Sequence, residues 1–326
     1  MPAEFDLIRR WFTADEWPAN VPLGVGDDAA LLDVPAGQRL AVTTDTLVCG
    51  VHFLPDVSAH DLGHKALAVN LSDLAAMGAQ PAWVLLALTL PSATDDAWLE
   101  AFSAGFLALA RAHDVALVGG DTTQGPLSIT VTAMGFVLPG AALTRAGAQP
   151  GDGVYVTGTL GDAALALHLL REGRIDAIAG GSELRSRLQC PTPRIGAGLA
   201  LRGLASAAID VSDGLAADLG HILERSGVGA LLHADALPRS PAFRACHSEP
   251  DTEAWQFALS GGDDYELLFT LPLARESELA ARFAALDVGC TRIGEIVADA
   301  GLRVLDRDGR ELPLARRGYE HFRNGA

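Results

Sequence analysis

Aspartates beside glycines and at the ends of apolar segments are the candidate catalytic and ligand-binding residues of this sequence. They recur along the whole chain as Asp27, Asp28, Asp45, Asp73, Asp121, Asp210, Asp213, Asp263 and Asp264. Any one of them alone could serve a turn, but so many in similar settings predict one site at which they converge. Two uncompensated carboxylates about 4 Å apart cost roughly 4 kcal/mol at an effective dielectric of about 20, so such a cluster must bind cations.

The available ligands predict magnesium rather than zinc. Cysteines are scattered, without a CxxC pair, and we interpret them as small core residues: Cys49, Cys190, Cys246 and Cys290. Oxygen ligands without His or Cys clusters favour Mg²⁺. A calcium loop would need alternating Asp residues that close on a Glu, and no such pattern occurs. Carboxylates, Mg²⁺ and glycine-rich backbone are together suited to binding a polyphosphate.

Charge and hydropathy exclude several classes of protein. A net charge of -17 over 326 residues argues against a nucleic-acid partner. No apolar run is long enough to span a membrane, and the first residues lack the pattern of a signal peptide, so we expect a cytoplasmic protein without a membrane partner. Lys65 is the only lysine, which excludes a Walker A site and the protein-kinase pattern. Metal ions must therefore supply much of the positive charge needed to handle phosphates.

A helix predicted over residues 62–78 positions Asp73. Leu67, Leu71 and Leu74 recur at helical spacing, so one stripe of this helix faces a core. Asp73 and Asn70 lie on the adjoining stripe, at the edge of the apolar seam. A partly desolvated carboxylate there stays charged only beside a cation or strong donors.

Strands and glycine turns position most of the other aspartates. Residues 40–48 form a strand with Asp45 at or near its end, and residues 115–118 form a strand that delivers Asp121 on two glycines. Residues 207–210 form a strand that turns into a helix, which Ser212 or Asp213 could cap. The remaining expected elements are helices over 5–11 and 98–113, strands over 83–90, 128–137 and 154–157, strands around 293 and 302, and a loop-rich passage over 180–194.

Two joins in the sequence bear on domain organisation. The turn at residues 150–153 predicts a boundary between domains over 1–149 and 150–326. The strand, glycines and helix after Thr157 resemble an anion-binding helix N-terminus. This join lacks the GxGxxG pattern and its closing acidic residue, which argues against a Rossmann dinucleotide site.

Several longer motifs, in the same order from about Phe5 to Phe322, resemble the thiamine-monophosphate kinase family, within the superfamily of aminoimidazole ribonucleotide synthetase. The motifs are Gly26-Asp-Asp-Ala-Ala, Thr43-Thr-Asp-Thr-Leu-Val, Gly50-Val-His-Phe, Lys65-Ala-Leu-Ala-Val-Asn-Leu-Ser-Asp-Leu-Ala-Ala-Met-Gly-Ala, Gly119-Gly-Asp-Thr-Thr, Thr157-Gly-Thr, Asp210-Val-Ser-Asp-Gly-Leu and Ser260-Gly-Gly-Asp-Asp-Tyr-Glu.

The resemblance implies a two-domain α/β (α+β) fold. The N-terminal domain, residues 1–149, would bind metal and ATP and form a homodimer through its sheet. The C-terminal α+β domain, residues 150–326, would complete the ATP and substrate site, with ATP in the cleft between domains. The implied activity is ATP-dependent phosphorylation of thiamine monophosphate to thiamine diphosphate, the last step of thiamine diphosphate biosynthesis.

The resemblance also implies a role for individual residues. The implied ligands of several Mg²⁺ ions are Asp28, Thr43, Thr44, Asp45, Asp73, Asp121, Asp210 and Asp213; of these, Asp45, Asp73, Asp121 and Asp210 would act catalytically through metal. The implied ATP contacts are Gly120, Asp121, Arg145 and Ser212. The implied contacts to thiamine monophosphate are His52, Asp263 and Tyr319. Two positions depart from the family pattern: Thr43 replaces a frequent Ser, and Asp263 replaces a frequent Glu and, being shorter, could require a bridging water.

The implied nucleophile is a phosphate oxygen that is already ionised near neutral pH, so no general base is expected and transfer is direct and in line.

Other enzymes of the superfamily fit less well. Selenophosphate synthetase needs a reactive N-terminal Cys or selenocysteine with a nearby lysine, and the hydrogenase-maturation relative ends in a reactive Cys. Aminoimidazole ribonucleotide synthetase is the nearest enzyme alternative, but the Gly-Asp-Asp-Ala-Ala and His-Phe segments fit it poorly. A nucleotide or metal sensor and a metal-dependent phosphohydrolase stay as alternatives from other classes.

Overall fold

The computed structural model of the protein describes residues 4–13, 17–247, 252–314 and 318. The chain divides into two compact units, Met1–Leu74 with Ala79–Ala142 and Ala75–Gly78 with Leu143–Ala326. Each unit contains one sheet and several helices, which confirms the predicted mixed α/β class. The exact boundary at residues 149 and 150 stays a prediction, because compactness alone does not define where a domain folds independently. Among the described helices, none combines the length and apolar character needed to cross a bilayer.

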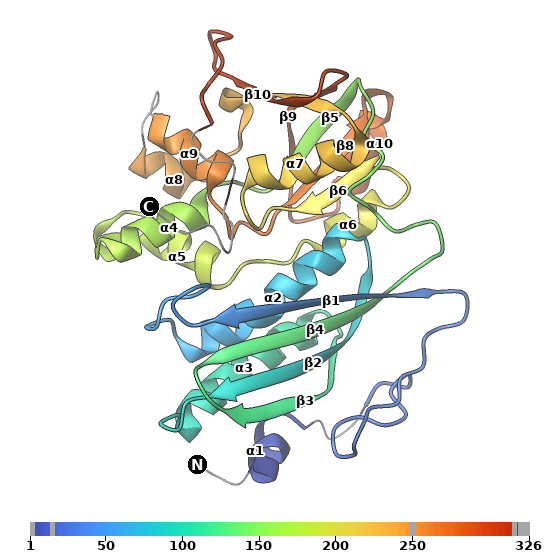
Figure 1. Cartoon of the computed structure of the whole chain (residues 1–326), viewed down its shortest axis with the longest axis vertical. Coiled ribbons are helices and arrows are strands. Elements are labelled where there is room, and N and C mark those ends of the chain that lie inside the picture. The colour runs from blue at the N-terminus through green and yellow to red at the C-terminus, as the bar shows by residue number, and fades with distance from the viewer. Residues whose placement is uncertain (1–3, 14–16, 248–251, 315–317, 319–326) are drawn as a thin grey trace. The chain divides into compact units, whose positions relative to one another are not determined.

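The first unit is built around a four-stranded sheet with the strand order β1-β4-β2-β3. Strand β4 pairs antiparallel with β1 and β2, and β2 pairs parallel with β3. Figure 1 shows α2 and α3 along one face of this sheet. The elements are α1 (Glu4–Trp11), β1 (Arg39–Val48), α2 (Ala59–Ala76), β2 (Gln80–Leu90), α3 (Asp96–Ala112), β3 (Ala116–Gln124) and β4 (Ser128–Val137).

Apolar stripes explain why these helices lie on the sheet. On α2, Leu67, Leu71 and Leu74 are at most 1% exposed, which confirms the predicted stripe. On α3, Phe102 and Phe106 are fully buried, and Asp95 caps the helix by accepting the N–H of Trp98 at 2.9 Å. The helices therefore bury one face of the sheet.

The other face of this sheet is only partly covered. Trp83, Met134 and Phe136 pack there with the segment around Val21 and Leu32. Nearer the edge formed by β1, apolar side chains stay in contact with solvent. Val42 is 58% exposed and Leu40 is 39% exposed. We refer to this side as the open face of the first sheet.

The second unit contains a six-stranded sheet with the order β10-β7-β9-β5-β8-β6. All neighbours pair antiparallel except β10 and β7, which are parallel. Its elements are β5 (Asp152–Thr157), α4 (Asp162–Arg171), η1 (Ile175–Ala177), α5 (Gly181–Gln189), α6 (Ile195–Leu201), β6 (Ala207–Asp210), α7 (Leu215–Ser226), β7 (Gly229–His233), η2 (Ala234–Ala236), α8 (Pro241–Cys246), α9 (Thr252–Ser260), β8 (Leu267–Pro272), η3 (Leu273–Arg275), α10 (Glu276–Phe283), β9 (Cys290–Val297) and β10 (Gly301–Leu305).

Helix α7 is the element of this unit that matters most for the site. It contacts β6, β8 and β10, and Figure 1 shows it lying along the sheet. Leu215, Leu219 and Ile222 occur at helical spacing, are fully buried and belong to one core cluster. The start of α7, directly after β6, is therefore fixed by packing.

Two expectations about elements are wrong. The passage over residues 180–194 is not loop-rich, because it contains helix α5, whose Leu184 and Leu188 are buried. Strand β3 does not end before its glycines but continues through Gly120 and Asp121 to Gln124. Pairing with β2 continues past Gly120, so the ladder of hydrogen bonds overrides the weak strand preference of glycine.

Candidate functional site

At one edge of the first sheet, β1 is joined to α2 by side chains of the predicted site. Thr43 donates its hydroxyl hydrogen to Asp73 Oδ2. The backbone N–H of Asp45 donates to Asn70 Oδ1 at 3.0 Å, and Asn70 Nδ2 donates to the Ala66 carbonyl at 3.1 Å. Asn70 is fully buried. These bonds bring Thr43, Asp45 and Asp73 together on the side of the sheet that the helices cover.

Asp121 lies elsewhere in the same unit. Asp45 lies two residues after Thr43 on β1, so its side chain is on the same face as that of Thr43, which bonds to α2. The row of Asp45 continues through Val131 and Leu86. Asp121 pairs with Ala87 one residue further along, so its side chain is on the open face. Strands β1 and β3 are also opposite edges of the sheet, three inter-strand spacings or about 14 Å apart. One chain cannot bind a single ion through both carboxylates.

Thr44 and Gly120 also differ from their neighbours in orientation. The Thr44 hydroxyl lies 3.1 Å from the Val131 carbonyl oxygen and 3.1 Å from Thr132 Oγ1, across β1 from Thr43. The Thr44 side chain therefore points away from the side chains of Thr43 and Asp73. Gly120 has a φ of 150°, and an added Cβ would lie 1.9 Å from the Leu86 carbonyl oxygen, so only glycine fits there.

Two predicted site residues of this unit lie in turns. His52 Nδ1 accepts the N–H of Val48 at 2.9 Å, which places the proton of the neutral ring on Nε2. Asp27 accepts the N–H of Asp28 at 2.9 Å, next to Gly26 at a φ of 129°. Asp27 therefore serves the turn, and the exposed Asp28 is the candidate ligand.

In the second unit, two segments place predicted residues side by side. Asp210 ends β6 and is 4% exposed. The Ser212 carbonyl accepts the N–H of Asp263 at 2.9 Å, and the Val211 carbonyl accepts the N–H of Tyr265 at 2.8 Å. The turn after β6 and the segment before β8 are thus hydrogen-bonded to each other.

Backbone conformation is unusual at this junction. Asp263 and Tyr265 are non-glycine residues with positive φ, at 68° and 50°. The Tyr265 hydroxyl donates to Asp263 Oδ1 at 3.1 Å. A Cβ added at Gly262 would lie 2.4 Å from the Ser212 carbonyl oxygen. Strained residues held by their surroundings are typical of functional sites, which supports the choice of Asp263.

Sequence reasoning missed Asp218, on the first turn of α7. One of its oxygens accepts the N–H groups of Ser212, Asp213 and Gly214 at 3.0, 3.1 and 3.1 Å. The pKa of Asp218 is raised to about 7, first by burial and then by the Asp213 carboxylate, while the backbone donors lower it. The N-cap of α7 is Gly214, so neither Ser212 nor Asp213 caps the helix. The sequence signal for Asp218 was its place one helical turn after the strand end and turn that contain Asp210 and Asp213.

A buried network lies beside this junction. Glu266 is fully buried and accepts from Arg187 at 2.7 Å, from two nitrogens of Arg194 at 2.6 Å and from Thr157 at 2.7 Å. Two arginines and a hydroxyl therefore satisfy its carboxylate. The network packs the start of β8 against the end of β5.

Asp264 belongs to this interior and not to the candidate ligands. It is 2% exposed and accepts the N–H of Gly161 at 2.8 Å. Burial raises its pKa well above the usual range of an aspartate. Because Asp264 already occupies the N-terminus of α4, and Asp162 begins that helix, this join does not bind an anion as its sequence suggested.

The other two predicted site residues, Arg145 and Tyr319, have few or no contacts that can be described. Arg145 is exposed, and its carbonyl oxygen accepts from Ser226 Oγ at 3.5 Å. Tyr319 lies outside the described residues. Among the described residues, no group of three or more His, Cys, Asp or Glu is arranged to hold a metal ion. The donors at the β1–α2 edge and at the Asp210–Asp213 turn are nonetheless all oxygens, which is the donor set that suits Mg²⁺.

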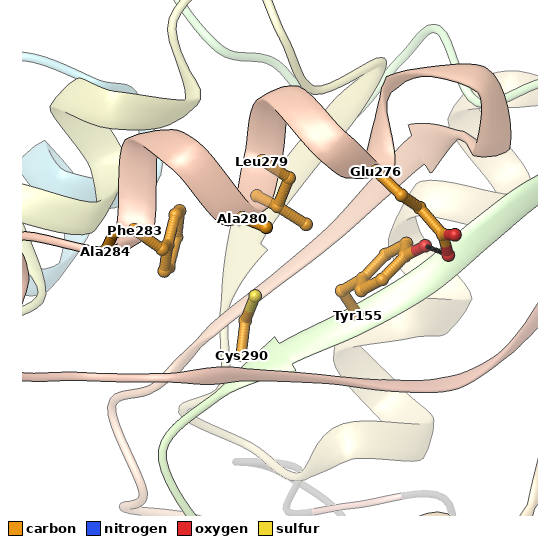
Figure 2. A pocket seen from close by; sticks show the side chains of 7 residues that line it. All are labelled: Tyr155, Glu276, Leu279, Ala280, Phe283, Ala284 and Cys290. Carbon is orange, nitrogen blue, oxygen red and sulfur yellow. Dashed lines mark hydrogen bonds between the residues drawn. The ribbon is translucent and has the colours of Figure 1, made fainter.

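A separate cavity of about 360 Å³ lies in the second unit. Figure 2 shows its lining, in which the Tyr155 hydroxyl is hydrogen-bonded to Glu276. Burial is the main reason that the pKa of Tyr155 is raised. The lining residues are Tyr155, Glu276, Leu279, Ala280, Phe283, Ala284 and Cys290. None of them is a predicted site residue.

Comparison with known families defines the class of protein. Residues 26–137 match the model of the AIR synthase related protein N-terminal domain, and residues 149–307 match that of the C-terminal domain. The chain thus has the two domains of AIR synthase related proteins, one containing the β1–α2 edge and the other the turn after β6.

Individual relatives narrow this class. The thiamine-monophosphate kinase of Salmonella typhimurium is 51% identical over 98% of both chains. The crystal structure of thiamine-monophosphate kinase from Stenotrophomonas maltophilia is 52% identical, with a TM-score of 0.84 over 90% of this chain and 93% of the other. A structure of AaThiL complexed with AMPPCP and TMP is 33% identical, with a TM-score of 0.77 over 89% of each chain. The chain belongs to the thiamine-monophosphate kinase family.

Proposed function

We propose that this protein transfers a phosphoryl group from ATP to thiamine monophosphate and so forms thiamine diphosphate, in the last step of thiamine diphosphate biosynthesis. The observation that carries the proposal is the identity of 51% over 98% of the chain to a relative named for this activity. A relative solved with AMPPCP and TMP, at 33% identity, supports ATP and thiamine monophosphate as the substrates.

We further propose that several Mg²⁺ ions bind to oxygen ligands of both domains. The proposed ligands are Asp28, Thr43, Thr44, Asp45, Asp73, Asp121, Asp210 and Asp213. When bound, the metal would neutralise phosphate charge, which lowers the repulsion between the acceptor and the γ-phosphate. The support is chemical. All these donors are oxygens, which suit Mg²⁺, and the chain has only one lysine that could neutralise phosphate charge instead.

Other residues would orient the two substrates. Gly120, Asp121, Arg145 and Ser212 are the proposed contacts to ATP; His52, Asp263 and Tyr319 are the proposed contacts to thiamine monophosphate. The domain over residues 1–149 would supply metal and ATP contacts, and that over 150–326 would complete the ATP and substrate contacts. The Nε2 hydrogen of His52 is a suitable donor to a phosphate or hydroxyl oxygen, because its Nδ1 is already occupied by Val48.

The reaction needs no general base from the protein. The attacking phosphate oxygen of thiamine monophosphate is already ionised near neutral pH, so the task of the side chains is to bind and align the two anions. We therefore propose direct in-line transfer without a phosphoenzyme. A stable phosphoprotein formed from labelled ATP alone would contradict this.

We propose that the protein is a homodimer and that a second copy completes the site. Leu40 and Val42 are exposed on the open face of the first sheet in a single chain. Exposed apolar side chains of this kind are expected where a second copy would cover the surface. Asp45 and Asp121 lie on opposite faces and opposite edges of that sheet. If both bind one ion, they must come from different copies of the chain.

Location and partners follow from the same proposal. A cytoplasmic enzyme without a nucleic-acid or membrane partner is expected, since ATP is a cytoplasmic substrate and the net charge is -17. The four cysteines are all free thiols, as in proteins of reducing compartments.

The experiment that tests the activity is ³¹P NMR of the purified protein with ATP, Mg²⁺ and thiamine monophosphate, beside a control without acceptor. Diphosphate resonances of thiamine diphosphate, matched by an equal amount of ADP, are expected only with acceptor. ADP and free phosphate in both tubes would indicate a phosphohydrolase. Absence of turnover in both would favour a nucleotide or metal sensor.

A further inference from the structure

Consecutive N–H groups of the turn over residues 212–214 all donate to a single oxygen of Asp218. The three donor–acceptor distances are 3.0, 3.1 and 3.1 Å. Asp218 is only 2% exposed, so water cannot easily replace its carboxylate. Without this oxygen, the turn would have neighbouring backbone donors with no partner of comparable strength.

This arrangement decides which kind of ligand the turn can bind. Consecutive N–H groups between a strand and a helix normally bind phosphate. Here Asp218 occupies them, so the turn offers its oxygen-bearing side chains, Asp210, Ser212 and Asp213, instead of its backbone donors. Oxygen donors of this kind suit a cation.

The other side of the turn is also held. The Ser212 carbonyl accepts the N–H of Asp263 at 2.9 Å. Gly214 has a φ of 122°, and an added Cβ would lie 2.9 Å from the carbonyl carbon of Ser260. The backbone of this turn is therefore restricted to one conformation. Asp218 holds it on one side and the 260–263 segment holds it on the other.

We propose that Asp218 is a positioning residue, which fixes the backbone of residues 212–214 so that Asp210, Ser212 and Asp213 bind metal and ATP. It contacts neither ligand nor reacting atoms itself. This inference rests on the proposed function of that turn. It goes beyond that function, because it assigns a role to a residue outside every predicted ligand set.

Two substitutions separate geometry from charge. Asp218→Asn keeps a carbonyl oxygen that can accept the same N–H groups, whereas Asp218→Ala leaves them without a partner. For Asp218→Ala we expect kcat to fall about tenfold or more, equivalent to ~1.4 kcal/mol in the barrier. The Mg²⁺ concentration for half-maximal rate should rise several-fold. Asp218→Asn should restore most of both. An Asn variant as impaired as the Ala variant would overturn the proposal, since the role would then be one of charge.

Matched controls exclude a merely structural effect. Glu224→Gln changes an exposed acid on the same helix and should alter neither kcat nor the Mg²⁺ requirement. Ile222→Val trims a fully buried residue of α7 and should lower the melting temperature without changing the Mg²⁺ requirement. If Ile222→Val shifted the Mg²⁺ requirement as much as Asp218→Ala at an equal loss of melting temperature, positioning would be refuted.

A measurement without turnover distinguishes this inference from the proposed function. Mn²⁺ is titrated into the full-length protein without nucleotide and followed by electron paramagnetic resonance. Weaker Mn²⁺ binding in Asp218→Ala, with wild-type binding in Asp218→Asn and Glu224→Gln, would support positioning even if no thiamine diphosphate were formed. Unchanged Mn²⁺ binding and unchanged kcat in Asp218→Ala, in a preparation whose wild type is active, would overturn positioning and leave the function intact.

Discussion

Asp263 and Asp264 are adjacent in the chain, yet their carboxylates have different environments. Asp263 is half-buried and accepts from the Tyr265 hydroxyl, whereas Asp264 is 2% exposed and accepts from Gly161. The second oxygen of Asp264 has no hydrogen-bond partner among the described residues. A protonated Asp264 suits this position, because a buried and incompletely paired charge is costly.

Asp264 should therefore make stability fall as pH rises. Its pKa is raised in the folded protein, so above the ordinary aspartate value of about 4 the folded state keeps a proton that the unfolded state has lost. The free energy of unfolding then decreases with pH, by at most ~1.4 kcal/mol per unit, up to the folded pKa. Asp264→Asn removes this loss, so urea denaturation should show the variant gaining stability relative to wild type as the pH rises above about 4.

The matched control is Asp235→Asn, which changes an exposed aspartate of the same unit. Its pH dependence should equal that of wild type. An unchanged pH dependence in Asp264→Asn would show that Asp264 is ionised when folded.

Sequence could identify the aspartates of this site but not separate their roles. Asp263 and Asp264 share one motif, and the donor that distinguishes them, Gly161, is remote in sequence. Asp218 was equally hidden, because its partners are backbone N–H groups, which every residue type except proline supplies. Burial and backbone partners emerge only when the chain is folded.

The contact between β1 and α2 positions three proposed metal ligands. Thr43 donates to Asp73, and Asn70 accepts from the backbone of Asp45. The Asn70 side chain of α2 thus accepts a backbone N–H of β1, as a neighbouring strand would at this edge of the sheet. Such a contact keeps these side chains in place relative to each other.

Asp73→Asn should separate activity from folding at this contact. The Asn carbonyl can still accept from Thr43, so the melting temperature should change little. Loss of the charge should lower kcat with Mg²⁺ by about 100-fold or more, equivalent to ~2.7 kcal/mol. Asp61→Asn, the same change on the first turn of α2, is the control and should retain turnover. Near-normal turnover in Asp73→Asn would refute the metal account.

Most elements were predictable because their apolar spacing is regular, and the exceptions have physical reasons. Helix α5 begins at a glycine and is rich in charge, which conceals it, although Leu184 and Leu188 at helical spacing with Pro191 beyond the end were usable signals. Strand β3 contains two glycines, which suggest a turn by themselves. Its pairing with β2, a tertiary interaction, decides otherwise.

Within one copy of the chain, two of the proposed metal ligands are too far apart to bind the same ion. Asp45 and Asp121 lie on strands that are about 14 Å apart across the first sheet, and their side chains are on different faces. Motifs along a single chain could not reveal this, because sheet order is set by which strands pair. A homodimer over the open face would let Asp121 of one copy serve the site that contains Asp45 of the other.

Subunit mixing tests that arrangement. Asp45→Asn and Asp121→Asn should each be inactive alone, since every site of either dimer lacks one carboxylate. After subunit exchange, half of the dimers contain one copy of each, and each mixed dimer has one intact site, so about a quarter of wild-type activity should return. Mixing Asp45→Asn with Asp73→Asn is the control, because both residues lie on one copy at the β1–α2 edge and no mixed dimer gains a complete site. If the first mixture exchanged subunits, as native mass spectrometry would show, and stayed inactive, each copy would have to bind its metal ions alone.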